Sequence, residues 1–145
     1  MATLERIVCS TSTEFTSAVT KLEKDTSDPN VLVFYLFLGE IVESTGLSWC
    51  PDCTRAEPVI NGEFQSFMQQ LTGAGGKQRI ILVSCTVSRT ELCSADFVLK
   101  TDPNVLLSCV PTLMTPVTGG ASSSRLGDAE CQSATQVRSF LAQWL

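Results

Sequence analysis

The residues of this sequence best suited to chemistry are two cysteines separated by two residues, Cys50 and Cys53, in the segment Ser-Trp-Cys-Pro-Asp-Cys. Two thiols at this spacing can exchange electrons with another disulfide through a mixed-disulfide intermediate. An amphipathic helical pattern follows the motif, so we expect the first cysteine at a helix N-terminus, where backbone N–H groups and the helix dipole stabilise a thiolate. The sequence therefore predicts that Cys50 attacks a disulfide and that Cys53, about one turn further on, resolves the mixed disulfide.

Three residues of the motif are expected to support the thiols. Pro51 fits the first turn of a helix, where its missing N–H costs nothing. A carboxylate at Asp52 stabilises the helix start but disfavours a second negative charge on the neighbouring Cys50. Trp49 is expected to flank the thiols and to form part of a substrate docking surface, with plain core packing as the alternative.

The alternative chemistry for this pair is metal binding. The sequence has seven cysteines, an odd number, and no histidine, and it contains a single C-x-x-C. A closed zinc site needs four ligands, so we expect no metal. Scattered cysteines also argue against a secreted disulfide framework. The other thiols are expected in the core or at helix ends, with Cys109 near the rim of the site: Cys9, Cys85, Cys93, Cys109 and Cys131.

The amino-acid composition is typical of an ordinary globular protein. Its 145 residues suit one domain spanning residues 1–145, with 43% apolar residues and a net charge of −5. This acidic balance argues against nucleic acid or an anionic membrane as the main partner. The longest apolar run, Val31–Leu38, is shorter than the roughly 20 residues needed to span a bilayer. The first residues lack the apolar stretch of a secretory signal, so we expect a cytosolic location.

The elements that must position the motif can be read from its flanks. Val31–Leu38 is apolar at every position, which is typical of a strand buried on both faces at the centre of an α/β sheet. Periodicity and turn residues predict further strands at 5–9, 79–85 and 110–114. They predict helices at 13–24, from 53 to the glycines at 73–76, at 94–100 and after Ser133. A hairpin is expected at 118–124. The sequence thus predicts an α/β fold in which a right-handed crossover carries the motif.

This order, with C-x-x-C after the second strand and Pro111 heading the fourth, resembles a thioredoxin fold, whose central mixed sheet of about five strands is flanked by helices. Within that fold, Trp49–Cys53 and the continuation to Pro58 resemble the Clot-type, thioredoxin-related WCPDC proteins. The resemblance extends to Val110–Leu113 and to Glu130-Cys131. The loop at 39–48 and the segment at 88–100 are particular to this chain, and we expect them to influence which partners bind.

The resemblance implies further roles for single residues. Cys50 is expected to be exposed and Cys53 covered, and Pro111, if its peptide bond is cis, leaves the backbone of Val110 free to pair with an extended substrate. Common thioredoxins keep a buried acid in the strand before the motif, and this chain has none there. Glu57 lies four residues after Cys53 on the same helical side, so it is the candidate proton acceptor, unless it is an ordinary solvated helix residue.

In function, the resemblance implies a protein-disulfide reductase, which we expect to be cytosolic and monomeric. It would bind no cofactor and would receive electrons from NADPH through thioredoxin reductase or an equivalent donor. Its substrates would be small or exposed disulfides such as cystine, with S-nitrosothiols and peroxide-linked turnover as further possibilities. NADPH should bind the reductase, because this sequence has no strand-linked G-x-G-x-x-G. A glutaredoxin-like, glutathione-dependent enzyme and a non-enzymatic redox-sensing adaptor are the alternatives.

Overall fold

The computed structural model describes residues 2–23, 28–74, 79–116 and 124–145. Its centre is a five-stranded mixed sheet with the strand order β1-β5-β2-β6-β7. The strands β1, β5 and β2 run parallel, whereas β6 pairs antiparallel with both β2 and β7. The strands are β1 (Thr3–Cys9), β2 (Val31–Gly39), β5 (Arg79–Val87), β6 (Thr112–Met114) and β7 (Arg125–Leu126). The expected mixed sheet of about five strands is confirmed.

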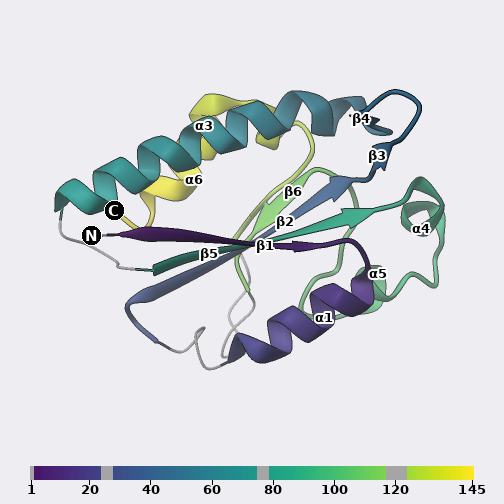
Figure 1. Cartoon of the computed structure of the whole chain (residues 1–145), viewed down its shortest axis with the longest axis horizontal. Coiled ribbons are helices and arrows are strands. Elements are labelled where there is room, and N and C mark those ends of the chain that lie inside the picture. Colours follow the sequence, from purple (N-terminus) through teal and green to yellow (C-terminus); the bar gives the residue numbers. More distant parts are fainter. Residues whose placement is uncertain (1, 24–27, 75–78, 117–123) are drawn as a thin grey trace.

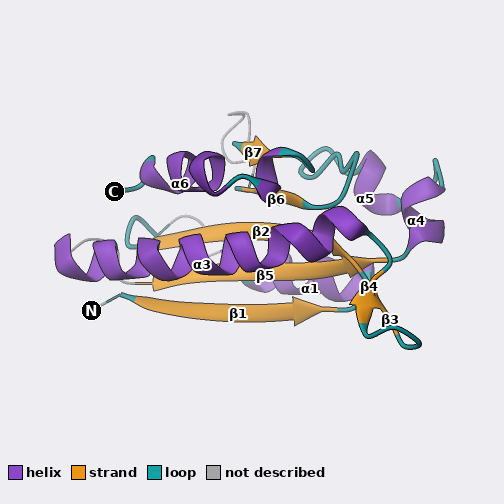
Figure 2. Cartoon of the chain, turned by 90° about the horizontal axis from the view of Figure 1, so that it is seen from above, coloured by secondary structure: helices purple, strands orange, loops and turns teal. Residues whose placement is uncertain are grey.

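Helices cover both faces of this sheet (Figures 1 and 2). The long helix α3 (Pro51–Ala74) and the last helix α6 (Ala134–Ala142) pack together on one face. The first helix, α1 (Ser12–Lys21), lies on the other face with the short α5 (Val98–Thr101). None of the described helices is long and apolar enough to cross a bilayer.

The central strand β2 is buried on both faces, as its uninterrupted apolar sequence predicts. Alternate residues face opposite sides. Phe34 and Leu36 join the cluster beneath α3 and α6, whereas Tyr35 and Phe37 join the cluster on the α1 side, where Phe15 contacts both rings. Both layers of helices are therefore anchored to the strand that leads to the cysteine motif.

Several predicted elements differ from the observed ones. The polar connection at 39–48 contains a small hairpin of β3 (Ile41–Val42) and β4 (Leu47–Ser48), which its few apolar residues did not reveal. The helix predicted at 94–100 is wrong in extent, because a capping box at Ser88 starts α4 (Arg89–Cys93) earlier and α5 forms separately. The strand predicted from 110 begins at Thr112, after Pro111. Residues 118–123 of the predicted hairpin lie outside the described residues.

We expect Phe34→Ala to lower the free energy of unfolding by about 3–5 kcal/mol. Phe34 is fully buried, and its ring contacts those of Phe64, Phe67, Phe140 and Trp144. The matched control is Val8→Ala, because Val8 is 73% exposed on β1. Urea unfolding measures both, and equal losses in the two variants would contradict this account of the core.

Candidate dithiol site

The two motif cysteines lie where β2 ends and α3 begins. Cys50 immediately precedes the helix, Pro51 is its first residue, and the N–H groups of Cys53 and Thr54 donate to the Cys50 carbonyl at 3.1 and 3.2 Å. Both thiols are free. The helix N-terminus predicted for the first cysteine is therefore present, and the missing N–H of Pro51 falls in the first turn.

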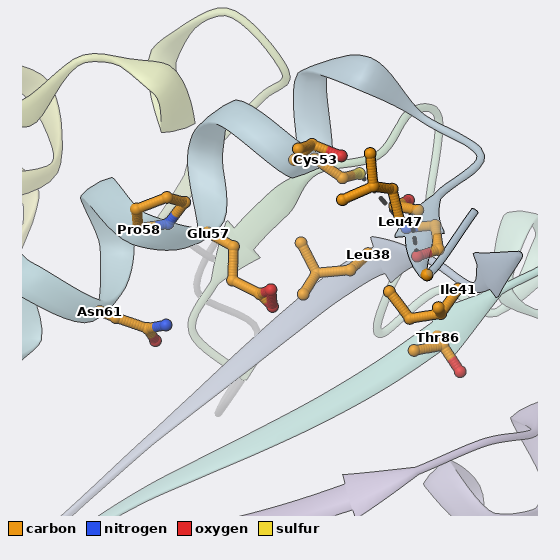
Figure 3. Close-up of a pocket in the computed structure, with 12 residues that line it drawn as sticks. Leu38, Ile41, Leu47, Cys53, Glu57, Pro58, Asn61 and Thr86 are labelled. Carbon is orange, nitrogen blue, oxygen red and sulfur yellow. Dashed lines mark hydrogen bonds between the residues drawn. The ribbon is translucent and has the colours of Figure 1, made fainter. Parts of the chain in front are cut away.

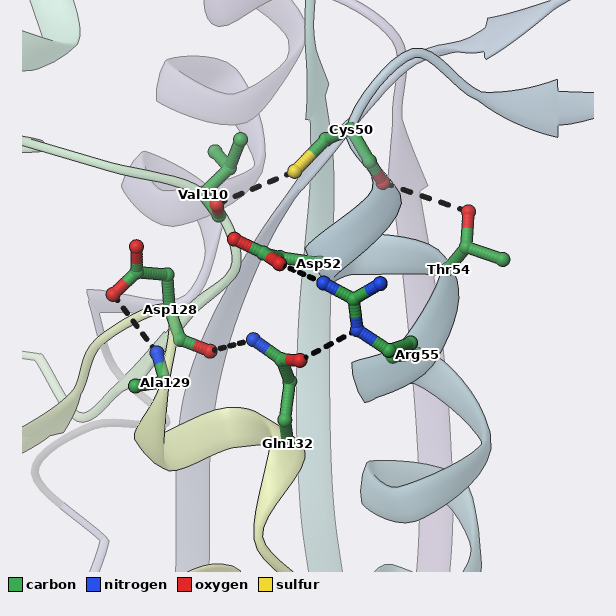
Figure 4. Close-up of polar contacts among 8 residues, drawn as sticks. All are labelled: Cys50, Asp52, Thr54, Arg55, Val110, Asp128, Ala129 and Gln132. Atoms are coloured by element: carbon green, nitrogen blue, oxygen red, sulfur yellow. Dashed lines mark hydrogen bonds and ion pairs between the residues drawn. The ribbon is translucent and has the colours of Figure 1, made fainter.

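Cys50 is less accessible than the resemblance implied. The residue is only 7% exposed, and the segment around Val110 lies beside its sulfur. The Cys50 Sγ donates to the Val110 carbonyl oxygen at 3.5 Å (Figure 4), and the Cys50 N–H donates to Ser48 Oγ at 3.1 Å. The expectation of an exposed Cys50 was wrong, and the sulfur is instead held against a backbone carbonyl.

The Val110–Pro111 peptide bond is cis, and both residues are buried. The Val110 carbonyl faces Cys50, whereas the Val110 N–H has no hydrogen-bond partner among the described residues. The fold thus brings the predicted docking backbone of residues 110 and 111 next to the first motif thiol.

Cys53 is the more deeply buried of the two residues, at 2% exposed. Burial raises the pKa of Cys53 well above its ordinary value, and the adjacent Cys50 raises it further, while the Gly39 N–H, which donates to the Cys53 Sγ at 3.2 Å, acts in the opposite direction. Cys53 therefore stays protonated at neutral pH.

Gly39, the last residue of β2, contacts the motif closely, which was not predicted from the sequence. A Cβ at this residue would lie 2.7 Å from Ser48 Oγ and 3.0 Å from both Cys50 Cβ and Trp49 Cε2. Ser48 Oγ also donates to the Gly39 carbonyl at 2.8 Å. A glycine directly after a long apolar strand was the available signal for such a close backbone approach.

Trp49 is half-buried, and its indole N–H donates to the Val87 carbonyl at 2.8 Å. The ring packs against the apolar cluster on the α1 side of the sheet. Trp49 therefore ties the start of the motif to the end of β5, which is the packing role weighed as its alternative. Its contribution to docking stays a prediction.

A cavity of about 360 Å³ opens beside the buried thiol, between α3 and the β3–β4 hairpin. Figure 3 shows its lining, which includes Cys53, Glu57, Leu38, Ile41, Leu47 and Thr86. Glu57 is exposed and makes no hydrogen bond to Cys53 within the described residues. The structure brings the predicted proton acceptor and the resolving thiol into one cavity, and the role of Glu57 stays a prediction.

Asp52 has an ionic partner that the sequence argument did not identify. Its carboxylate pairs with Arg55, one turn further along α3, and Arg55 Nε donates to Gln132 Oε1 at 2.8 Å (Figure 4). The i, i+3 spacing of Asp52 and Arg55 was visible in the sequence. The contact between Arg55 and Gln132, which are far apart in the sequence, could not be predicted from it.

The remaining cysteines are distributed largely as predicted. Cys9, Cys85 and Cys131 are buried, Cys93 is exposed at the end of α4, and Cys109 is half-buried with its Sγ 3.6 Å from Thr112 Oγ1. Burial raises the pKa of Cys85 and of Cys131 to about 12. Among the described residues, no three cysteine or carboxylate side chains are grouped so as to hold a metal ion.

We expect Gly39→Ala to disrupt this site. The added methyl group must displace Ser48, Cys50 or Trp49, which costs roughly 1–3 kcal/mol of folding stability and slows alkylation of Cys50. The control is Gly62→Ala on α3, where a Cβ meets nothing within 4 Å and alanine favours the helix. Thermal unfolding and iodoacetamide labelling measure both effects, and equal behaviour of the two variants would refute the close approach at Gly39.

Comparisons with known proteins agree with this geometry. A thioredoxin-like protein Clot of Oryza sativa subsp. japonica is 33% identical over 104 residues, covering 70% of each chain. The Clot protein of Arabidopsis thaliana is 38% identical over 69 residues, covering 48% of this chain and 51% of that protein. An acireductone dioxygenase of Leishmania infantum is 33% identical over 125 residues, covering 84% of this chain but 35% of that protein. The chain thus spans about a third of the length of the first curated relatives it matches.

A family model for the thioredoxin domain of proteins like thioredoxin domain-containing protein 17 matches residues 10–143. This match and the Clot relatives confirm the resemblance and the fold that the sequence motifs predicted. The chain belongs to the thioredoxin domain-containing protein 17-like family, and its fold is a thioredoxin domain.

Proposed function

We propose that this protein is a thiol–disulfide oxidoreductase that reduces small or exposed disulfides with Cys50 and Cys53. The observation that carries the proposal is the different setting of the two thiols. Cys50 begins α3 and lies 3.5 Å from the carbonyl of the docking segment, whereas Cys53 is covered and hydrogen-bonded by Gly39. These settings support a nucleophile at Cys50, beside the segment where a substrate would dock, and a resolving thiol at Cys53.

In the first step, the Cys50 thiolate attacks one sulfur of the substrate disulfide. A bond forms between Cys50 and that sulfur, the substrate S–S bond breaks, and the other half leaves as a thiolate that takes a proton from water. The helix N-terminus favours the attacking thiolate. An extended substrate can pair with the free N–H of Val110 beside Pro111, and Trp49 completes the docking surface.

In the second step, Cys53 loses its proton and attacks the Cys50 sulfur. The Cys50–Cys53 disulfide forms, and the second half of the substrate is released as a thiol, so the dithiol has supplied two electrons. Because burial raises the pKa of Cys53, this step needs a proton acceptor. Glu57 lines the same cavity and can accept the proton directly or through water.

The oxidised pair must then be reduced again. The proposed donor is an NADPH-dependent thioredoxin reductase or an equivalent enzyme, which passes two electrons to the disulfide. NADPH is oxidised on that partner, so this chain needs no bound cofactor. We place this cycle in the cytosol, with a monomer as the working form.

The test is NADPH consumption in a mixture of this protein, cystine and a thioredoxin reductase. We expect many cystine molecules to be reduced per protein molecule, and Cys50→Ser to abolish the turnover. Exposed Cys93 provides the matched control, because Cys93→Ser should leave the rate unchanged.

Other outcomes of this assay would overturn the proposal. Turnover that requires glutathione instead of the reductase would indicate a glutaredoxin-like enzyme. A single round of reduction that stops at the Cys50–Cys53 disulfide, with any donor, would indicate a redox-sensing adaptor.

Glu57→Gln should slow resolution of the mixed disulfide on the order of tenfold near pH 7, which is less than a buried general base contributes, because Glu57 is exposed. The difference should shrink as pH rises, since hydroxide then removes the Cys53 proton without help. Stopped-flow release of a chromogenic thiol measures the rate. Equal rates of wild type and variant at every pH would exclude this role.

A further inference from the structure

Asp52 belongs to a chain of polar contacts that leads from the active-site helix to a distant segment (Figure 4). Its carboxylate pairs with Arg55, and Arg55 Nε donates to Gln132 Oε1 at 2.8 Å. Gln132 belongs to the short helix η1 (Glu130–Gln132), and its Nε2 donates to the Asp128 carbonyl at 2.9 Å. The first turn of α3 is thereby joined to residues that follow β7.

The position of Asp52 gives this chain of contacts a consequence for the thiols. Asp52 is the second residue of α3, and Cys50 directly precedes that helix. In Figure 4 both side chains lie on the side of α3 that faces Val110. Because Asp52 follows Cys50 by two residues, its carboxylate opposes a negative charge on Cys50, since two like charges disfavour each other's ionised form.

Gln132 restricts where the Arg55 guanidinium can lie. Arg55 is 61% exposed, and an exposed ion pair is normally weak because two long side chains must be held in one geometry. A second contact from another element reduces that cost, since Arg presents its donors in a planar fork. Gln132 is itself fixed, because η1 is anchored by the fully buried Cys131, whose N–H donates to the Gly127 carbonyl at 3.0 Å.

We propose that Arg55, held by Gln132, is a positioning residue that offsets the Asp52 charge and so increases the thiolate fraction of Cys50. This inference rests on the proposed function, in which that thiolate attacks the substrate. It also gives η1 a role in the chemistry, because Gln132 acts on Cys50 only through Arg55 and Asp52.

The side chains of the other ionisable residues near the motif and η1 do not take part in this chain of contacts. Cys53 lies in the first turn of α3 and is protonated at neutral pH. Cys109 precedes the docking segment and contacts Thr112. From the η1 side, Asp128 Oδ1 accepts the Ala129 N–H, and Glu130 Oε1 accepts the Gly127 N–H. Substitution of Arg55 or Gln132 leaves these contacts in place.

The test follows alkylation of Cys50 by iodoacetamide, a neutral reagent, across pH and at low salt, with mass spectrometry reporting that residue alone. Arg55→Met should lower the rate of Cys50 alkylation roughly twofold to threefold near neutral pH, as expected for one partly screened charge. Gln132→Leu should lower it less and in the same direction. Asp52→Asn should raise it, and Arg55→Met should have no further effect in that background.

The matched control is Arg138→Met. Arg138 belongs to α6, is 63% exposed and pairs with Glu63. Glu63 lies on α3, but well beyond the first turn that follows Cys50, so loss of Arg138 should leave the alkylation profile unchanged. Circular dichroism checks that each variant is folded. Alkylation needs no substrate or reductase, so failure of the proposed reductase activity would be seen separately.

Two results would overturn the inference. Identical alkylation profiles for Arg55→Met and Arg138→Met would show that Arg55 does not influence Cys50. An undiminished effect of Arg55→Met in the Asp52→Asn background would show that Arg55 acts without Asp52. Salt offers a further check, because the effect should largely vanish at about 1 M, where charges are screened within about 3 Å.

Discussion

The site depends on one close approach, between the end of β2 and the start of α3 at Gly39. Its N–H donates to the Cys53 sulfur, its carbonyl accepts from Ser48 Oγ, and its missing side chain leaves room for Cys50 and Trp49. Because β2 is buried between both helical layers, this contact joins the motif to the central strand of the core. The two thiols therefore have defined surroundings before any substrate arrives.

Those surroundings differ between the two cysteines. Burial raises the pKa of Cys53 and keeps its thiol protonated. In the proposed reaction, this would leave the attack on a substrate disulfide to Cys50. Cys50 lies at the helix start against the carbonyl of Val110, in the segment that would receive an extended substrate. Charged side chains lie near both thiols. Glu57 lines the cavity beside Cys53, and the Asp52–Arg55 ion pair lies in the helical turn that follows Cys50. Backbone geometry and local charge together give these two chemically identical groups different surroundings.

Much of this could be predicted from the sequence where a strong local pattern was present. The apolar run of β2 and the periodicity of α3 identified the central strand, the helix start and hence the place of both thiols. The accessibility of Cys50 could not be predicted, because it depends on Val110, which is distant in the sequence. Val110 lies beside the sulfur because β6, which follows it, pairs with β2. The Arg55–Gln132 contact was missed for the same reason: nothing local links residues that the fold alone brings together.

The most direct test of the assigned roles is to trap the intermediate. In Cys53→Ser, a substrate disulfide should form a stable mixed disulfide that cannot be resolved, and peptide mapping should find the substrate attached to Cys50. Cys50→Ser should trap none, because burial keeps the Cys53 thiol protonated. Substrate attached to Cys53 in the Cys50→Ser variant, or to Cys109 in place of Cys50, would contradict the account.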